Sequence, residues 1–184
     1  NATNISLKLL YHPETLEILG VQAVGQDGTE KRIDVIATAI KSKLKVTELS
    51  DLELAYAPPF SSAKDPVNIL GYIAENIIDG HYKVAYPSQV EEFIKQNAFF
   101  LDVRIPEEFA EGSIFGSVNI EVDELRTRIS EINVSKDTPI VVNCYVGLRA
   151  YLAIMILKSQ GYTNLYNLSG GYRTYSALNY KLNS

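Results

Sequence analysis

The sequence predicts an α/β protein in which a small α+β domain is followed by an α/β domain with a parallel sheet. Three observations lead to this prediction. In the second part of the chain, short apolar strands alternate with helical segments, which is typical of a parallel sheet with helices on both faces. The first part opens with two strand-like segments around a turn, which favours a hairpin. Residues 81–87 show neither the apolar spacing of a helix nor the alternation of a strand, and therefore predict a linker. The domains are expected at residues 1–82 and 83–184.

In the first domain, the clearest single signal is the start of its last helix. Asp65 accepts hydrogen bonds from free helix amides, and Pro66 tolerates the first helical position. Gly80 then predicts the end of that helix. Thr47 is expected to cap a shorter helix. The expected elements are, in order, strands at 5–11 and 17–24, and helices at 33–40, 46–52 and 65–79.

The second domain is expected to begin with a short helix capped by Ser88. The apolar runs after it predict buried strands, and the segments between them have helical spacing. The expected strands are at 98–103, 117–120, 139–143 and 164–168, and the further helices at 106–111, 123–132, 149–160 and 171–178.

Composition excludes several classes of function. The net charge of −5 is spread over two mildly acidic halves, so there is no basic stripe for a nucleic acid. No apolar run approaches the ~20 residues of a membrane helix, and the sequence shows no basic-then-apolar leader, so we expect no secretory signal. One cysteine and two histidines predict no disulfide and no metal site, and they suit a reducing, cytoplasmic compartment. Because Asn1 stands first in place of Met, we expect an excised piece of a longer protein.

The most informative segment surrounds the single cysteine. An apolar strand at 139–143 delivers Cys144 to the carboxyl edge of the expected sheet, where ligands bind in open α/β proteins. A short loop containing Gly147 follows, and Arg149 opens a helix. Inward-facing amides and a helix N-terminus stabilise a thiolate, which is a nucleophile. The alternative is a buried cysteine that only packs in the core.

Motifs spread over residues 88–178 resemble a rhodanese domain. Cys144 and its loop resemble the active-site loop of that family. Ser113 departs from the pattern, which has His there, and we expect this change to affect packing more than chemistry. The other matching motifs are Phe100-Leu101-Asp102-Val103-Arg104, Glu108-Phe109, Glu111-Gly112, Ile114, Gly116, Asn119-Ile120 and Leu168-Ser169-Gly170-Gly171-Tyr172.

The resemblance implies sulfur transfer through a persulfide. The Cys144 thiolate would attack a sulfane sulfur, and a second nucleophile would then remove that sulfur. Arg149 would organise the loop, with Asp102 as its candidate partner, although each has an alternative reading as a structural residue. The backbone amides that would cradle the terminal sulfur belong to Tyr145, Val146, Gly147 and Leu148.

Two other functions are compatible with this fold. Cell-cycle-type dual-specificity phosphatases share it, but their Cys…Arg loop is one residue longer and has His before the cysteine. Here four residues separate Cys144 from Arg149, and Asn143 precedes the cysteine. A non-catalytic docking or sensor module is the other alternative, although the presence of Cys144 favours the enzyme.

The first domain is similar to the dimerisation domain of FAD-dependent pyridine-nucleotide disulfide oxidoreductases, most closely to the coenzyme A-disulfide reductase branch. This resemblance implies a homodimer in which Tyr56 reaches toward coenzyme A on the partner subunit. Tyr56 is alternatively a packed interface residue. The matching runs are Gly20-Val21-Gln22-Ala23-Val24-Gly25, Lys31-Arg32-Ile33-Asp34-Val35 and the stretch 54–68, which contains Ala55-Tyr56-Ala57-Pro58-Pro59-Phe60.

Some members of that branch carry a rhodanese domain after the dimerisation domain, in the order found here. The resemblance therefore implies that FAD, NAD(P)H and coenzyme A serve the full-length protein, and that this fragment alone binds no cofactor. Thiosulfate, persulfides and coenzyme A are the implied sulfur donors and thiol acceptors. Cys144 would take persulfide sulfur, and a thiol carrier would deliver it to the flavin site.

Overall fold

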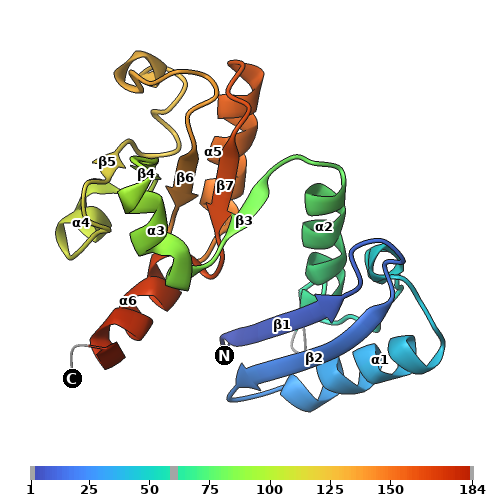
Figure 1. The fold of residues 1–184 in the computed structure, drawn as a ribbon. Coiled ribbons are helices and arrows are strands. Elements are labelled where there is room, and N and C mark those ends of the chain that lie inside the picture. The colour runs from blue at the N-terminus through green and yellow to red at the C-terminus, as the bar shows by residue number, and fades with distance from the viewer. Residues whose placement is uncertain (1–2, 59–61, 183–184) are drawn as a thin grey trace. The chain divides into compact units, whose positions relative to one another are not determined.

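The computed structural model describes residues 3–58 and 62–182. Its contacts divide the chain into two compact units, residues 1–79 and 80–184, which are described separately below (Figure 1). The boundary expected from the sequence, between residues 82 and 83, stays a prediction about the domains. No helix in the described part of the chain is long and apolar enough to cross a membrane.

The first unit is an antiparallel hairpin packed with helices. Strands β1 and β2 pair directly, with an irregular register between Leu10 and Tyr11. One face of the hairpin is more exposed than the other, as period-two alternation requires. The bounds are β1 Ile5–Tyr11, β2 Ile18–Gly25, α1 Thr29–Lys41, the 3₁₀ turn η1 Val46–Leu49 and α2 Pro66–Ile78.

Two features hold this unit together. Its apolar core is formed by side chains of β2, α1, η1 and α2. The buried members are Ile18, Ile36, Ala39, Val46, Leu49, Val67 and Ala74. Beside the core, Arg32 forms a buried ion pair with Asp65, with 2.7 Å between Nη2 and Oδ2. Asp65 also accepts a hydrogen bond from the Val67 amide at 3.0 Å, so the predicted cap of α2 is present and carries a second, tertiary contact.

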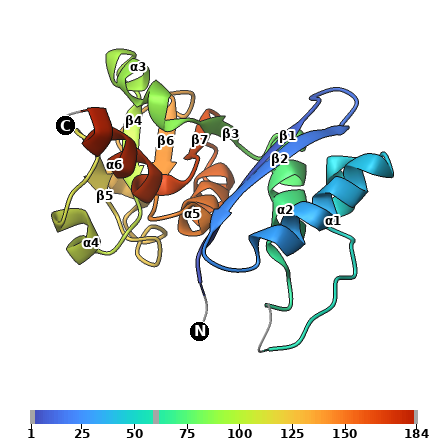
Figure 2. The same cartoon turned by 90° about the horizontal axis from the view of Figure 1, so that it is seen from below.

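The second unit is a five-stranded sheet in the order β3-β7-β6-β4-β5, with every pair parallel. Strand β6 lies at the centre, and all four of its residues are buried. Helices α3 and α5 lie on opposite faces of this sheet (Figure 2). The bounds are β3 Lys83–Ala85, η2 Pro87–Gln89, α3 Val90–Lys95, β4 Phe99–Asp102, α4 Pro106–Ala110, β5 Val118–Asn119, η3 Ile129–Glu131, β6 Ile140–Asn143, α5 Leu148–Ser159, β7 Leu165–Leu168 and α6 Gly171–Leu182.

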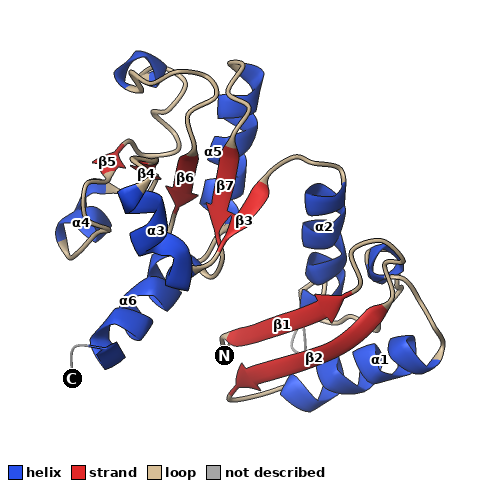
Figure 3. Cartoon of the chain, viewed as in Figure 1, coloured by secondary structure: helices blue, strands red, loops and turns tan. Residues whose placement is uncertain are grey.

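The predicted linker at residues 81–87 is wrong. Residues 83–85 form β3, which pairs with β7 and makes the edge of the sheet (Figure 3). Three residues are too few to show an alternating pattern, and the partner strand lies about eighty positions further along the chain. Ser88 does not cap the helix that follows. The chain begins helical turns at Pro87, and Gln89 Oε1 accepts a hydrogen bond from the Tyr86 amide instead.

Three further expectations differ from the structure. The expected helix at 123–132 is a series of turns that ends in η3, and Leu125 and Ile132 are its buried apolar residues. Thr47 does not cap its helical turn, since Glu48 bonds back to the Lys45 amide at 2.7 Å. The last helix, α6, extends to Leu182 instead of ending at residue 178.

Candidate active site

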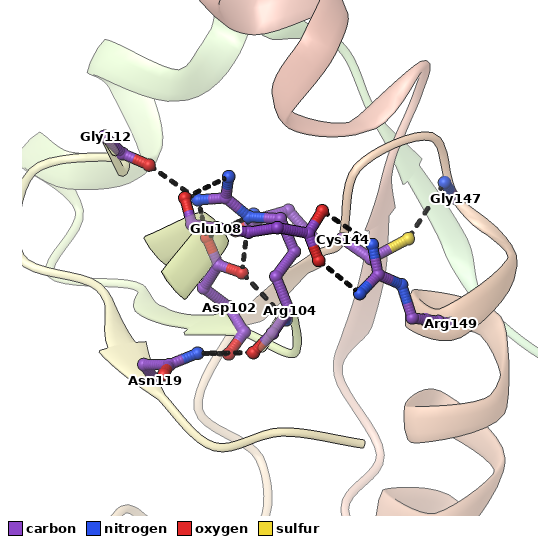
Figure 4. Close-up of polar contacts among 9 residues, drawn as sticks. Asp102, Arg104, Glu108, Gly112, Asn119, Cys144, Gly147 and Arg149 are labelled. Carbon is purple, nitrogen blue, oxygen red and sulfur yellow. Dashed lines mark hydrogen bonds and ion pairs between the residues drawn. The ribbon is translucent and has the colours of Figure 1, made fainter. Parts of the chain in front are cut away.

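Cys144 lies where the sequence places it, directly after β6 at the carboxyl edge of the sheet. Its side chain is buried, with 1% of its surface exposed. The backbone N–H of Gly147 donates a hydrogen bond to Cys144 Sγ, with 3.0 Å between nitrogen and sulfur (Figure 4). A thiolate at this position would therefore receive at least one backbone donor, as anion sites in such loops do.

Gly147 is the residue that closes the loop. Its φ of 134° lies in the region that side chains other than hydrogen disfavour, so glycine fits the sharp return of the backbone toward the sulfur. Helix α5 begins at the next residue, Leu148, and its N-terminal dipole favours negative charge beside it. Donation from the amides of Tyr145, Val146 and Leu148 to a terminal sulfur stays a prediction.

The first turn of α6 fixes the loop from its other side. The Tyr172 amide donates to the Cys144 carbonyl at 2.8 Å, and the Arg173 amide donates to the Tyr145 carbonyl at 3.1 Å. Gly171 has φ 62°, and a Cβ there would lie 2.5 Å from Tyr145 O and 2.6 Å from Cys144 O. This close approach is the physical reason for glycine at position 171.

Arg149 lies beside Cys144 but bonds to a residue that the sequence did not identify. Its two terminal nitrogens donate to both carboxylate oxygens of Glu108 on α4, at 2.6 and 2.9 Å (Figure 4). The hydrogen bonds that Arg149 donates to Glu108 raise the pKa of Arg149, and the charge of Cys144 adds to that rise. The hydrogen bonds from Arg149 lower the pKa of the Glu108 carboxyl. The guanidinium thus lies between a carboxylate and the candidate nucleophile.

The expected pairing of Arg149 with Asp102 is wrong, because Arg104 occupies that carboxylate. Asp102 is fully buried at the end of β4, and it accepts hydrogen bonds from Arg104 Nε and Nη2 at 2.6 to 3.0 Å. It also accepts a hydrogen bond from Asn143 Nδ2 at 2.9 Å. The sequence did contain a signal for the true partner. The Glu108-Phe109 motif supplies a carboxylate, and a carboxylate can accept two hydrogen bonds from one arginine.

The buried pair of Asp102 and Arg104 also holds the backbone of α4 and of the residues after it, because Arg104 binds two carbonyl groups there. Arg104 Nη1 donates to the Glu108 carbonyl at 2.9 Å, and Nη2 donates to the Gly112 carbonyl at 2.7 Å. The guanidinium also stacks on the ring of Tyr172, 4.1 Å from its centroid. Asp102 therefore acts in the structure as the anchor of a network that holds the α4 backbone, including Glu108. A catalytic role for Asp102 stays a prediction.

Tyr56 belongs to the first unit, and its role as a coenzyme A contact stays a prediction. Its side chain is 52% exposed. The neighbouring residues Pro59, Phe60 and Ser61, which belong to the motif that singled it out, lie outside the described residues. Ser113 is half-buried, and its effect stays a prediction. Among the described residues, no group of three or more His, Cys, Asp or Glu side chains is placed to hold a metal ion.

Two family models match the chain. The rhodanese-like domain model covers residues 86–178, just over half of the sequence. The model of the pyridine nucleotide-disulphide oxidoreductase dimerisation domain covers residues 1–66. The predicted fold class, a small dimerisation-type domain followed by a parallel-sheet domain of rhodanese type, is thereby confirmed.

One curated relative matches less than half of the chain, and two solved structures match nearly all of it. It is 43% identical over 75 residues to the coenzyme A disulfide reductase of Staphylococcus haemolyticus, which is 41% of this chain and 17% of that protein. The reduced CoADR-RHD protein of Bacillus anthracis matches with a TM-score of 0.93 and 43% identity, over 98% of this chain and 32% of its own. A NAD-dependent persulfide reductase from A. fulgidus matches with a TM-score of 0.81 and 37% identity, over 93% of this chain and 30% of its own. The chain thus spans a third or less of these relatives, and the predicted resemblance to the C-terminal part of a reductase–rhodanese fusion is confirmed.

Proposed function

This chain belongs to the rhodanese-like domain family, and on that premise we propose that it is a sulfurtransferase that carries sulfane sulfur as a persulfide on Cys144. The observation that carries the proposal is the hydrogen bond from the Gly147 amide to Cys144 Sγ, at 3.0 Å, in a loop at the carboxyl edge of the sheet. That geometry favours a nucleophilic thiolate over a cysteine that only fills space.

The reaction has two balanced steps. The Cys144 thiolate attacks the sulfane sulfur of a donor, the donor's sulfur–sulfur or sulfur–sulfite linkage breaks, and the leaving group departs with the bonding electron pair as a thiolate or sulfite. A thiol acceptor, as its thiolate, then attacks the terminal sulfur of the persulfide, and Cys144 regains its thiolate. The Gly147 amide and the N-terminus of α5 stabilise negative charge on the sulfur throughout.

Phosphate hydrolysis is the weaker alternative for the same loop. Four residues separate Cys144 from Arg149, and the loop folds so tightly that a backbone amide contacts the sulfur directly. A phosphoryl group needs several donors arranged around three oxygens. The charge on Arg149 is moreover already matched by Glu108. These features favour a single sulfur atom as the occupant of the loop.

For the whole protein we propose a homodimeric FAD- and NAD(P)H-dependent coenzyme A-disulfide or persulfide reductase. The match of residues 1–66 to a dimerisation domain and the names of the relatives support this. In the described part of the chain, the loop after β6 closes on the Cys144 sulfur, and the features argued above suit a sulfur atom at this edge of the sheet. We therefore assign these cofactors, and reduction of the transferred sulfur, to the whole protein, with Tyr56 as a coenzyme A contact in its dimer.

The test is intact-mass spectrometry after incubation with thiosulfate or glutathione persulfide, with Cys144→Ser as the matched variant. A reducible gain of one sulfur atom in wild type alone is expected. If the folded wild-type chain gains no sulfur from either donor, the sulfurtransferase proposal fails, and the docking or sensor reading takes its place.

A further inference from the structure

The arginines around Cys144 are already engaged with partners within the chain. The loop residues 145–148 carry no charged side chain. Arg149, the cation beside the sulfur, has both terminal nitrogens on Glu108. Arg104 is paired with Asp102, and Arg173, whose amide holds the loop, is engaged in an interaction of its own.

From this balance we infer that Glu108 is a specificity-determining residue: by neutralising Arg149, it tunes the Cys144 site to organic persulfides of low charge and against the thiosulfate dianion. The inference rests on the proposed sulfurtransferase function and adds the class of donor. Glu108 acts through Arg149 and is therefore a positioning and charge-compensating residue, with no contact to the reacting atoms assigned to it.

Glu108 is held in place for this role. Arg104 binds its backbone carbonyl at 2.9 Å, and the 2.6 and 2.9 Å bonds to Arg149 fix its carboxylate in a bidentate arrangement. Arg149 also lowers the pKa of this carboxyl, so Glu108 is ionised at neutral pH. The pair is consequently close to neutral whenever a donor arrives.

The mouth of the site agrees with an organic donor. Beside the buried sulfur, the loop exposes three apolar side chains: Tyr145 at 45%, Val146 at 48% and Leu148 at 69%. Contact between these side chains and the carbon part of an organic persulfide buries apolar surface, which favours binding. They provide no hydrogen bond or charge to replace the hydration of a small dianion.

Charge matters most for thiosulfate because of its reaction. The Cys144 thiolate attacks the outer sulfur, the sulfur–sulfur bond of thiosulfate breaks, and sulfite leaves with the electron pair. Three negative charges meet at the sulfur in that step, whereas an organic persulfide brings fewer. Removing the carboxylate of Glu108 would leave the charge of Arg149 unmatched and would favour the thiosulfate step by about threefold to tenfold at low ionic strength.

The experiment compares donors in the 184-residue chain. The kcat/KM values for sulfur transfer to a thiol acceptor are measured with thiosulfate and with L-cysteine persulfide, whose ammonium and carboxylate cancel. Glu108→Gln is expected to raise the thiosulfate-to-persulfide ratio, and added salt should reduce the gain. Glu107→Gln is the matched control, because this exposed residue of α4 has the same charge and does not bind Arg149. Glu108→Asp keeps the charge and should keep the wild-type ratio.

Three results would overturn the inference alone: a Glu108→Gln ratio equal to that of Glu107→Gln, an equal loss with both donors, or the same change in Glu108→Asp as in Glu108→Gln. Circular dichroism and a melting curve confirm that each variant is folded. If the folded wild type transfers sulfur from neither donor, the proposed function itself fails and the inference falls with it.

Discussion

The contact between Gly171 and the Cys144 loop leads to the sharpest prediction about the site. In Gly171→Ala, the added Cβ would lie 2.5 Å from Tyr145 O and 2.6 Å from Cys144 O. Both are backbone atoms, so no side-chain rotation relieves the clash. The loop and the start of α6 must separate by about 1 Å to restore ordinary contact distances.

The expected cost has two sources. Holding alanine at φ 62° costs about 1–2 kcal/mol. Weakening the two hydrogen bonds that the Tyr172 and Arg173 amides donate to the loop costs about 1 kcal/mol each. The free energy of unfolding should therefore fall by about 3–4 kcal/mol. Because a displacement of this size misplaces the nucleophile, the rate of persulfide formation should fall by about 100-fold.

Gly161→Ala separates the clash from backbone strain. Gly161 ends α5 with φ 86°, and a Cβ there meets no atom within 4 Å. This variant should lose about 1–2 kcal/mol of stability and keep the wild-type rate. Urea unfolding and quenched-flow mass spectrometry measure both quantities. Persulfide formation at the wild-type rate in folded Gly171→Ala would refute the reasoning that α6 positions the loop.

Two further predictions concern the ion pairs around the site. Asp102→Asn should lower the free energy of unfolding by about 3–5 kcal/mol, since it leaves Arg104 buried without its countercharge; a loss below 1 kcal/mol in urea unfolding would contradict this. Because Arg149 lowers the Glu108 pKa from 4.5, their pair stabilises the fold fully above that pH and loses its contribution as pH falls through the lowered value. Both side chains are about a third exposed, so the difference in unfolding free energy between wild type and Glu108→Gln should be about 1 kcal/mol or less at pH 7. It should shrink as the pH falls below 4.5 and through the lowered pKa, and a difference that does not change over the acid range would exclude the pair as its source.

The features that could be read from the sequence are those encoded by neighbouring residues. Asp65-Pro66 specifies a helix start through bonds to the next few amides, and α2 begins there. The apolar run before Cys144 specifies a buried strand, and β6 is buried throughout. In both cases, local chemistry and the tertiary fold agree.

The features that could not be read depend on distant partners. Strand β3 exists because β7 pairs with it, and its own three residues carry no pattern. The partner of Arg149 was misassigned for a related reason. Asp102 ends β4 and Glu108 lies six residues further on, but the Asp102 carboxylate is already occupied by Arg104, two residues away. The ion pair between Glu108 on α4 and Arg149 in the first turn of α5 forms between segments that are about forty residues apart in the sequence.

The most direct test of the account is to locate the transferred sulfur. The wild-type chain and Cys144→Ser are incubated with an organic persulfide, the remaining thiols are capped, and the digested peptides are analysed by mass spectrometry. The account predicts one added, reducible sulfur on the peptide that contains Cys144, and none in the variant. An unmodified Cys144 peptide from folded wild-type protein, or an equal gain in the variant, would contradict it.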